Sequence, residues 1–139
     1  MQQVIVYSNE TGGVTVCHPS GELSIENTKA KDTPMRSIIV DKAVLPEEYS
    51  VFFDAWELSG EVIVVNIDKA KTVGHEIRRA AREKELAPYD AIIAKQIPGQ
   101  SAQDAEAARQ NIRAKYAEIQ QQIDSAATPE AIKQALNLT

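Results

Sequence analysis

The most regular feature of the sequence is a stripe of apolar residues at helical spacing in its C-terminal half. Its members recur every three or four residues: Ala105, Ala108, Ile112, Tyr116, Ile119, Ile123 and Ala126. This spacing places them on one side of an α-helix, in a strip as narrow as the seam between two paired helices. Because an isolated helix of this kind is marginal in water, the stripe predicts that another helix covers it.

A second segment, residues 69–97, is rich in strong helix formers, and Asp68 is the predicted N-cap. Its apolar positions keep the same spacing except for a slip around residues 82–85, just before Pro88. They are Val73, Ile77, Ala80, Ala81, Leu86, Tyr89, Ile93 and Ile97. Interior proline removes a backbone hydrogen bond, so we expect a kink or a short break there.

The dipeptide Pro98-Gly99 separates the two helical segments, and Ser101 is placed to cap the second one. Short connections between helices favour an antiparallel hairpin. Thr128 followed by Pro129 then predicts a short terminal helix that runs to about Leu136.

The first 67 residues have strand-forming composition instead. We predict a β-hairpin over residues 3–17, a short helix over 25–31 capped by Ser24, a strand over 37–40 and a second hairpin over 56–67. The predicted fold class is therefore α+β: a small β-rich head with one short helix (residues 1–67), then an antiparallel helical hairpin and a short terminal helix (residues 68–139).

Two sets of residues are candidates for contact with partners. The aromatic segment 49–58, whose large rings should form the core of the head, supplies Phe53, Trp56 and Leu58. The helical stripe supplies Ile112, Tyr116, Ile119 and Ile123. The spacing of the stripe leaves two readings open, packing within one hairpin or packing between chains as a homo-oligomer or on a partner helix.

Charge is distributed unevenly along the chain, whose net charge is -5. Residues 1–67 carry 4 basic and 10 acidic side chains, and residues 68–139 carry 11 and 10. Phosphate contacts need clustered lysine and arginine, so this balance disfavours nucleic acid as a partner. The apolar runs are short, which disfavours a membrane partner, and the start lacks the pattern of a secretory signal, which predicts synthesis in the cytoplasm.

Searches for catalytic, metal-binding and cofactor-binding motifs give no candidate. The segment beginning His75-Glu76 resembles the start of a zinc-protease helix, but Arg79 stands where the second histidine ligand is needed. Cys17-His18 is the other pair of soft ligands, and a metal site generally needs three or four. Acidic pairs such as Glu47-Glu48 are typical of an ordinary surface. The glycines form neither a phosphate-binding loop that ends in Gly-Lys-Ser/Thr nor a Gly-x-Gly-x-x-Gly turn.

A local basic cluster lies on the first long helix. It consists of Arg78, Arg79, Arg82 and Lys84, with Glu76, Glu83 and Glu85 interleaved. Pairs such as Glu76-Arg79 explain this arrangement as a solvated helix face. The alternatives are contact with the acidic head, in this molecule or a neighbour, and contact with nucleic acid.

Several segments together resemble a group of small proteins encoded by tailed bacteriophages, often among their tail and fibre genes. The resembling segments are VYSNETGGV (6–14), LSIENTKAKDTP (23–34), FDAWELSG (53–60), VNIDKAK (65–71), IRRAAR (77–82) and AATPEAIK (126–133). The layout, a β-rich head followed by long helices, is also similar in style to tail-fibre assembly proteins. The resemblance implies no catalytic residues and no cofactor.

The resemblance implies a non-enzymatic structural protein, made in the host cytoplasm and incorporated into the virion at the tail or its fibres. Its partners would be other phage structural proteins. The alternative is a chaperone that binds the fibre during assembly and then leaves. A third hypothesis, a small phage hydrolase or regulator, finds no nucleophile and base pair or basic groove to support it.

Overall fold

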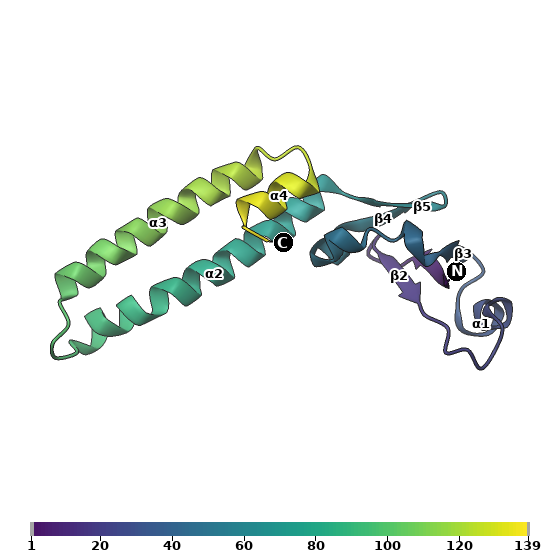
Figure 1. Ribbon diagram of the computed structural model, residues 1–139, viewed down its shortest axis with the longest axis horizontal. Coiled ribbons are helices and arrows are strands. Elements are labelled where there is room, and N and C mark those ends of the chain that lie inside the picture. The colour runs from purple at the N-terminus through teal and green to yellow at the C-terminus, as the bar shows by residue number, and fades with distance from the viewer. Residues whose placement is uncertain (1, 139) are drawn as a thin grey trace. The chain divides into compact units, whose positions relative to one another are not determined.

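The computed structural model describes residues 2–138 and has the predicted α+β architecture (Figure 1). Three strands and one helix, a 3₁₀ region and a β-hairpin are followed by three α-helices. The chain divides into two compact units, residues 1–70 and residues 71–139. We call them the head and the helical unit and describe each by itself.

The head contains a three-stranded antiparallel sheet with β1 (Gln3–Ser8) between β2 (Val14–Cys17) and β3 (Ile38–Asp41). The first predicted hairpin is confirmed, since β1 and β2 pair directly. Its turn is held by the side chain of Asn9, whose Oδ1 accepts hydrogen bonds from the backbone N–H groups of Thr11 and Gly13. Gly12 has φ +86°, a conformation that favours glycine.

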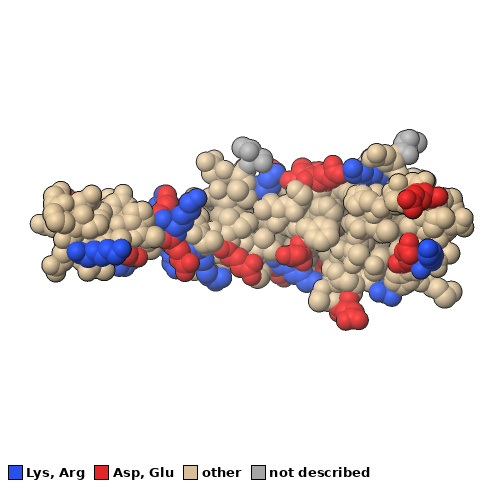
Figure 2. All heavy atoms as spheres, turned by 90° about the horizontal axis from the view of Figure 1, so that it is seen from below, with Lys and Arg blue, Asp and Glu red and all other residues tan. Residues whose placement is uncertain are grey.

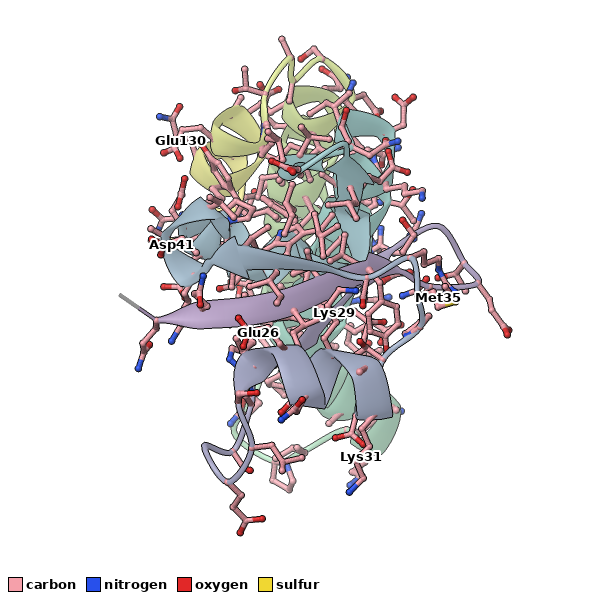
Figure 3. The ribbon with its side chains drawn as sticks, turned by 90° about the vertical axis from the view of Figure 1, so that its right-hand side faces the viewer. Glu26, Lys29, Lys31, Met35, Asp41 and Glu130 are labelled. Atoms are coloured by element: carbon pink, nitrogen blue, oxygen red, sulfur yellow. The ribbon has the colours of Figure 1, made fainter. Side chains whose placement is uncertain are left out.

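The central strand β1 is covered on both faces. Helix α1 (Ile25–Asp32), capped by Ser24 as predicted, packs beside one face of the sheet (Figure 3). The opposite face belongs to the main apolar core, which consists of Val4, Val6, Val14, Val40, Leu45, Trp56 and Ile63. Alternate residues of a strand point to opposite faces, so the consecutive buried residues Val4, Ile5 and Val6 of β1 contribute to both layers.

The aromatic segment forms a structure that the sequence pattern did not predict. Two 3₁₀ helices, η1 (Lys42–Val44) and η2 (Glu47–Ala55), lead into the second hairpin. That hairpin is confirmed as β4 (Trp56–Ser59) paired with β5 (Val62–Val65), ending two residues earlier than expected. Phe52 is fully buried, as expected for the core of the head.

The first turn of α2 (Ile67–Lys95) corrects the predicted cap. The capping residue is Asn66, whose Oδ1 accepts a hydrogen bond from the Lys69 backbone N–H, and not Asp68. Asn66 is also held from β4, because its Nδ2 donates to Glu57 Oε1, while Lys69 Nζ lies 2.8 Å from Glu57 Oε2. Asp68 therefore lies inside the first turn, where a carboxylate still favours the helix dipole.

The helical unit contains the rest of α2, α3 (Ala102–Asp124) and α4 (Pro129–Ala135). Helices α2 and α3 run side by side in opposite directions, and α4 lies at the end where α2 begins and α3 ends (Figure 1). The antiparallel order follows from three ion pairs between α2 and α3: His75 with Asp124, Glu85 with Lys115, and Asp90 with Arg109. Pro88 lies within a continuous helix, so the predicted short break is absent.

The predicted caps of the last two helices are confirmed. Ser101 Oγ accepts from the Asp104 N–H, and Thr128 Oγ1 accepts from the Ala131 N–H. Helix α4 packs tightly on α2 at Gly74, where an added Cβ would lie 2.9 Å from Ile132 Cγ2. Ile132 and Ile123 are fully buried and form the centre of this unit.

Candidate functional site

The three predicted contact residues of the head differ in their exposure. Trp56 is buried in the main core, and its indole N–H donates to the Tyr49 carbonyl over 3.1 Å. Leu58 is half-buried against the same core. Phe53 remains 41% exposed while its ring packs at 5.0 Å, centroid to centroid, on Trp56. Phe53 is thus the member of this group that a partner can reach directly.

The four stripe residues lie in the interior of the helical unit. Ile123 and Tyr116 are buried, and Ile112 and Ile119 are half-buried. Ile123 packs against α2 at Gly74 within the chain, which agrees with the first of the two readings that the spacing left open. Ile112 and Ile119 keep part of their surface exposed, and a contact between chains through them stays a prediction.

Exposed large apolar side chains lie in the head. Among the described residues they are Leu23, Met35, Val44, Val51, Phe53, Val62 and Val64. Met35, in the loop between α1 and β3, is 99% exposed (Figure 3). Within residues 71–138, by contrast, no large apolar side chain is exposed to this degree. The exposed side chains of the head are the large apolar groups that a partner could cover.

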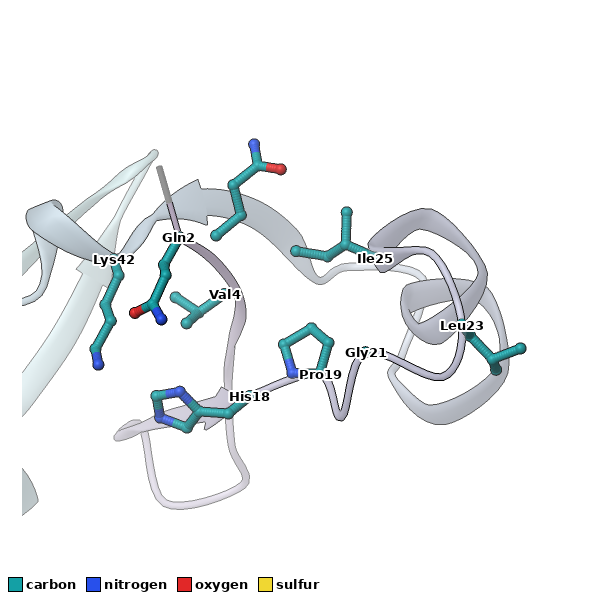
Figure 4. Close-up of a pocket in the computed structure, with 9 residues that line it drawn as sticks. Gln2, Val4, His18, Pro19, Gly21, Leu23, Ile25 and Lys42 are labelled. Atoms are coloured by element: carbon teal, nitrogen blue, oxygen red, sulfur yellow. The ribbon is translucent and has the colours of Figure 1, made fainter.

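Two hollows open on the head beside the end of the sheet, and they share His18 and Lys42. One, which we call the polar hollow, is lined also by Gln2, Gln3 and Pro19 (Figure 4). The other, which we call the apolar hollow, has a volume of about 510 Å³. Its remaining lining residues are Val16, Leu45, Glu47, Ser50, Phe53 and Trp56.

Strand geometry explains why His18 and Lys42 meet. β2 ends at Cys17 and β3 ends at Asp41, on either side of the start of β1. The next residue of each strand therefore leaves the sheet at the same end, and the Lys42 backbone N–H donates to the Gln2 carbonyl over 2.9 Å. In Figure 4 the side chains of Gln2, His18 and Lys42 point into one space. The sequence search missed this pair because it considered His18 only beside Cys17.

The prediction of a solvated face for the basic cluster on α2 is confirmed for Arg79 and Lys84, which are exposed, but is wrong for Arg78. Arg78 is only 4% exposed, and its Nε donates to His75 Nδ1 over 3.2 Å. His75 Nδ1 must then be an acceptor, so Nε2 carries the hydrogen that is donated to Asp124 Oδ1 over 2.8 Å. Burial lowers the pKa of Arg78, with repulsion from Arg79 and Arg82 adding to the effect and Asp124 opposing it.

The segment of α2 around residues 82–85, where the apolar spacing is interrupted, contains a second polar contact with α3. Lys115 Nζ donates to Glu85 Oε1 over 2.8 Å and lies 4.8 Å from the centroid of the Tyr116 ring. Hydrogen bonds from Lys115 and Tyr116 lower the pKa of Glu85. Burial, together with Glu85, raises the pKa of Tyr116 to about 12. The slip therefore places charged groups where the stripe of α3 meets α2, and Ala80, expected on the apolar face, is exposed.

Surface charge is mixed. On the face shown in Figure 2, lysine and arginine side chains are interspersed with aspartate and glutamate. Among residues 2–138, no group of three or more histidine, cysteine, aspartate and glutamate side chains is arranged to hold a metal ion. The described helices include none that is long and apolar enough to cross a membrane.

Comparisons with known proteins give no relative. The chain matches no protein-family model, no curated protein and no solved structure.

Proposed function

We propose that the chain is a non-enzymatic structural protein of a tailed bacteriophage, a virion component at the tail or its fibres that acts through protein-protein contacts. The phage setting is supported by the resembling segments, which are spread over most of the sequence. The contact role is supported by one structural observation, the concentration of exposed apolar side chains in the head.

That concentration has a physical meaning. The head buries a complete core, including the large rings of Phe52 and Trp56, and still leaves Phe53 and the β5 residues Val62 and Val64 in solvent. Apolar area removed from water contributes roughly 25 cal/mol per Å². A partner that covers these side chains gains this free energy without unfolding any part of the head. We therefore assign the contact surface to the head and a spacer or support role to the helical unit.

Mass spectrometry of purified particles tests this proposal. Particles produced by a host that carries the gene should contain the chain at a constant ratio to the tail proteins, through repeated purification. A particle preparation that lacks the chain would contradict the virion role. If fibres then misassemble when the gene is deleted, the fibre-assembly chaperone replaces the structural role.

A further inference from the structure

We propose that the polar and apolar hollows of the head, which share His18 and Lys42, bind a peptide segment of a partner protein in which a carboxylate lies next to an apolar side chain. The inference rests on the contact role in the proposed function and adds the chemistry of the partner. It does not depend on the phage setting.

Charge favours an anionic ligand at these hollows. The head is acidic, with 10 acidic and 4 basic side chains in residues 1–67, yet one of those four, Lys42, lines both hollows beside His18. Within residues 2–138 the Lys42 ammonium forms no ion pair and no hydrogen bond, in contrast to Arg36, which donates to the Ser8 carbonyl. An unpaired, half-buried ammonium favours an anionic ligand.

Other hydrogen-bond donors lie around that ammonium. The side chains of Gln2, His18 and Lys42 point into the same space (Figure 4). The ammonium, the imidazole and the amide NH₂ can each donate to a carboxylate, which has two acceptor oxygens. The carboxylate Glu47 lines the apolar hollow but not the polar one. The anion therefore belongs on the side of Gln2, away from Glu47.

An apolar wall lies beside His18 and Lys42. Leu45, Phe53 and Trp56 line the apolar hollow, whose volume of about 510 Å³ accommodates a large side chain and the backbone beside it. Phe53 is the exposed member of this wall. Because His18 and Lys42 line both hollows, a carboxylate held by them would place a neighbouring apolar side chain against Phe53. A free small anion would leave that wall uncovered, so a peptide is the ligand that fits.

Titration of the ¹⁵N-labelled full chain, followed by NMR, tests the site. The probe is a capped tetrapeptide with the sequence Gly-Glu-Leu-Gly. We expect saturable shifts of the backbone amides of Val16, His18, Lys42 and Phe53. Replacing glutamate by glutamine in the peptide should weaken binding by about tenfold, the scale of one charge-assisted hydrogen bond. Replacing leucine by glycine should weaken it by a similar factor.

Variants of the protein complete the test. Lys42→Met keeps the apolar stem and should weaken binding of the glutamate peptide but leave the weak binding of the glutamine peptide unchanged. Lys31→Met is the matched control, since Lys31 is an exposed lysine of the same unit that projects from α1 away from the sheet (Figure 3). Circular dichroism checks that both variants fold.

Three results would overturn the inference: no saturable shift with the peptide, equal binding of the glutamate and glutamine peptides, or binding of free sodium glutamate with the affinity of the peptide. The outcome is distinguishable from that of the virion test. If the chain is present in particles but does not bind the peptide, only the proposed binding site is contradicted. If the chain binds the peptide but is absent from particles, only the proposed phage role is contradicted.

Discussion

The head and the helical unit solve the problem of burial in opposite ways. The head has an almost purely apolar core and leaves large apolar side chains such as Phe53 and Met35 in solvent. The helical unit covers its large apolar side chains but takes the charged side chain of Arg78 into its interior. An exposed apolar side chain can still be buried by a partner, whereas a buried charge restricts how helices can pair. The comparison supports the proposal that partners bind the head, while the buried charge of the helical unit limits how its own helices can pair.

Adjacent phenylalanines in the head give the largest expected contrast. Phe52 is fully buried and Phe53 is 41% exposed. Phe52→Ala should lower the free energy of unfolding by about 3–5 kcal/mol, because it leaves a cavity. Phe53→Ala should cost about 0.5–1.5 kcal/mol through its lost contact with Trp56. Urea unfolding followed by fluorescence of Trp56, the single tryptophan, measures both. Equal losses would remove the distinction between core and contact surface.

A similar pair in the helical unit tests whether the stripe is covered within the chain. Ile123→Ala should destabilise this unit by about 2–5 kcal/mol, because Ile123 is fully buried. Ile112→Ala, at a half-buried position of the same helix, should cost clearly less. Far-ultraviolet circular dichroism, recorded during chemical unfolding, follows the loss of the helices. If the loss at Ile123 grew as the protein was diluted, the stripe would be buried between chains.

Replacement of His75, which accepts a hydrogen bond from the buried guanidinium of Arg78, tests how much this hydrogen bond contributes to stability. His75→Phe should cost about 1–3 kcal/mol, because the Nε–H of Arg78 loses its acceptor. The double variant His75→Phe with Arg78→Met should recover most of this loss, since both partners then become apolar. The four unfolding free energies form a double-mutant cycle. Additive losses would mean that the hydrogen bond contributes nothing.

The close approach of α4 to α2 predicts a smaller effect. Gly74→Ala should introduce an overpacking cost of about 1–3 kcal/mol against Ile132, offset by about 1 kcal/mol from the better helix propensity of alanine. Asn111→Ala, at an exposed position of α3, is the control for propensity alone and should be neutral or slightly stabilising. A Gly74→Ala variant that melts above the parent chain would show that Ile132 moves aside easily.

Alkaline pH should affect the helical unit through Tyr116. Its pKa is raised from 10.0 to about 12 in the folded chain. A raised pKa means that the stabilisation is complete below the unfolded value of 10.0 and is lost as the pH rises through about 12. Tyr116→Phe should flatten the decrease of helical stability in that window. Thermal melts at several alkaline pH values measure it, and an unchanged decrease in the variant would assign the effect to other groups.

Local patterns allowed much of the fold to be predicted. Helices and their caps at Ser101 and Thr128 depend on neighbouring residues, so spacing and capping chemistry were sufficient. The 3₁₀ helix at residues 47–55 has no such period, so the sequence pattern did not predict it. The cap at Asn66 was missed because the side chain that supports it, Glu57, comes from another strand.

The candidate sites were harder to predict than the fold. The apolar spacing of α2 can be read from the sequence. The rotation of the helix about its own axis, which buries Arg78 and exposes Ala80, cannot. The charged groups of α2 were therefore assigned to solvent. His18 and Lys42 are far apart in the chain and meet only because β2 and β3 end on either side of β1. Such a pair becomes visible only once the strand order is known.

Sedimentation velocity over a wide concentration range tests the central comparison most directly. If the helical unit covers its own stripe, the isolated chain should sediment as a monomer at every concentration, and Ile112→Ala should leave its sedimentation coefficient unchanged. A concentration-dependent oligomer that Ile112→Ala weakens would contradict this account, because the stripe of α3 would then be a contact between chains.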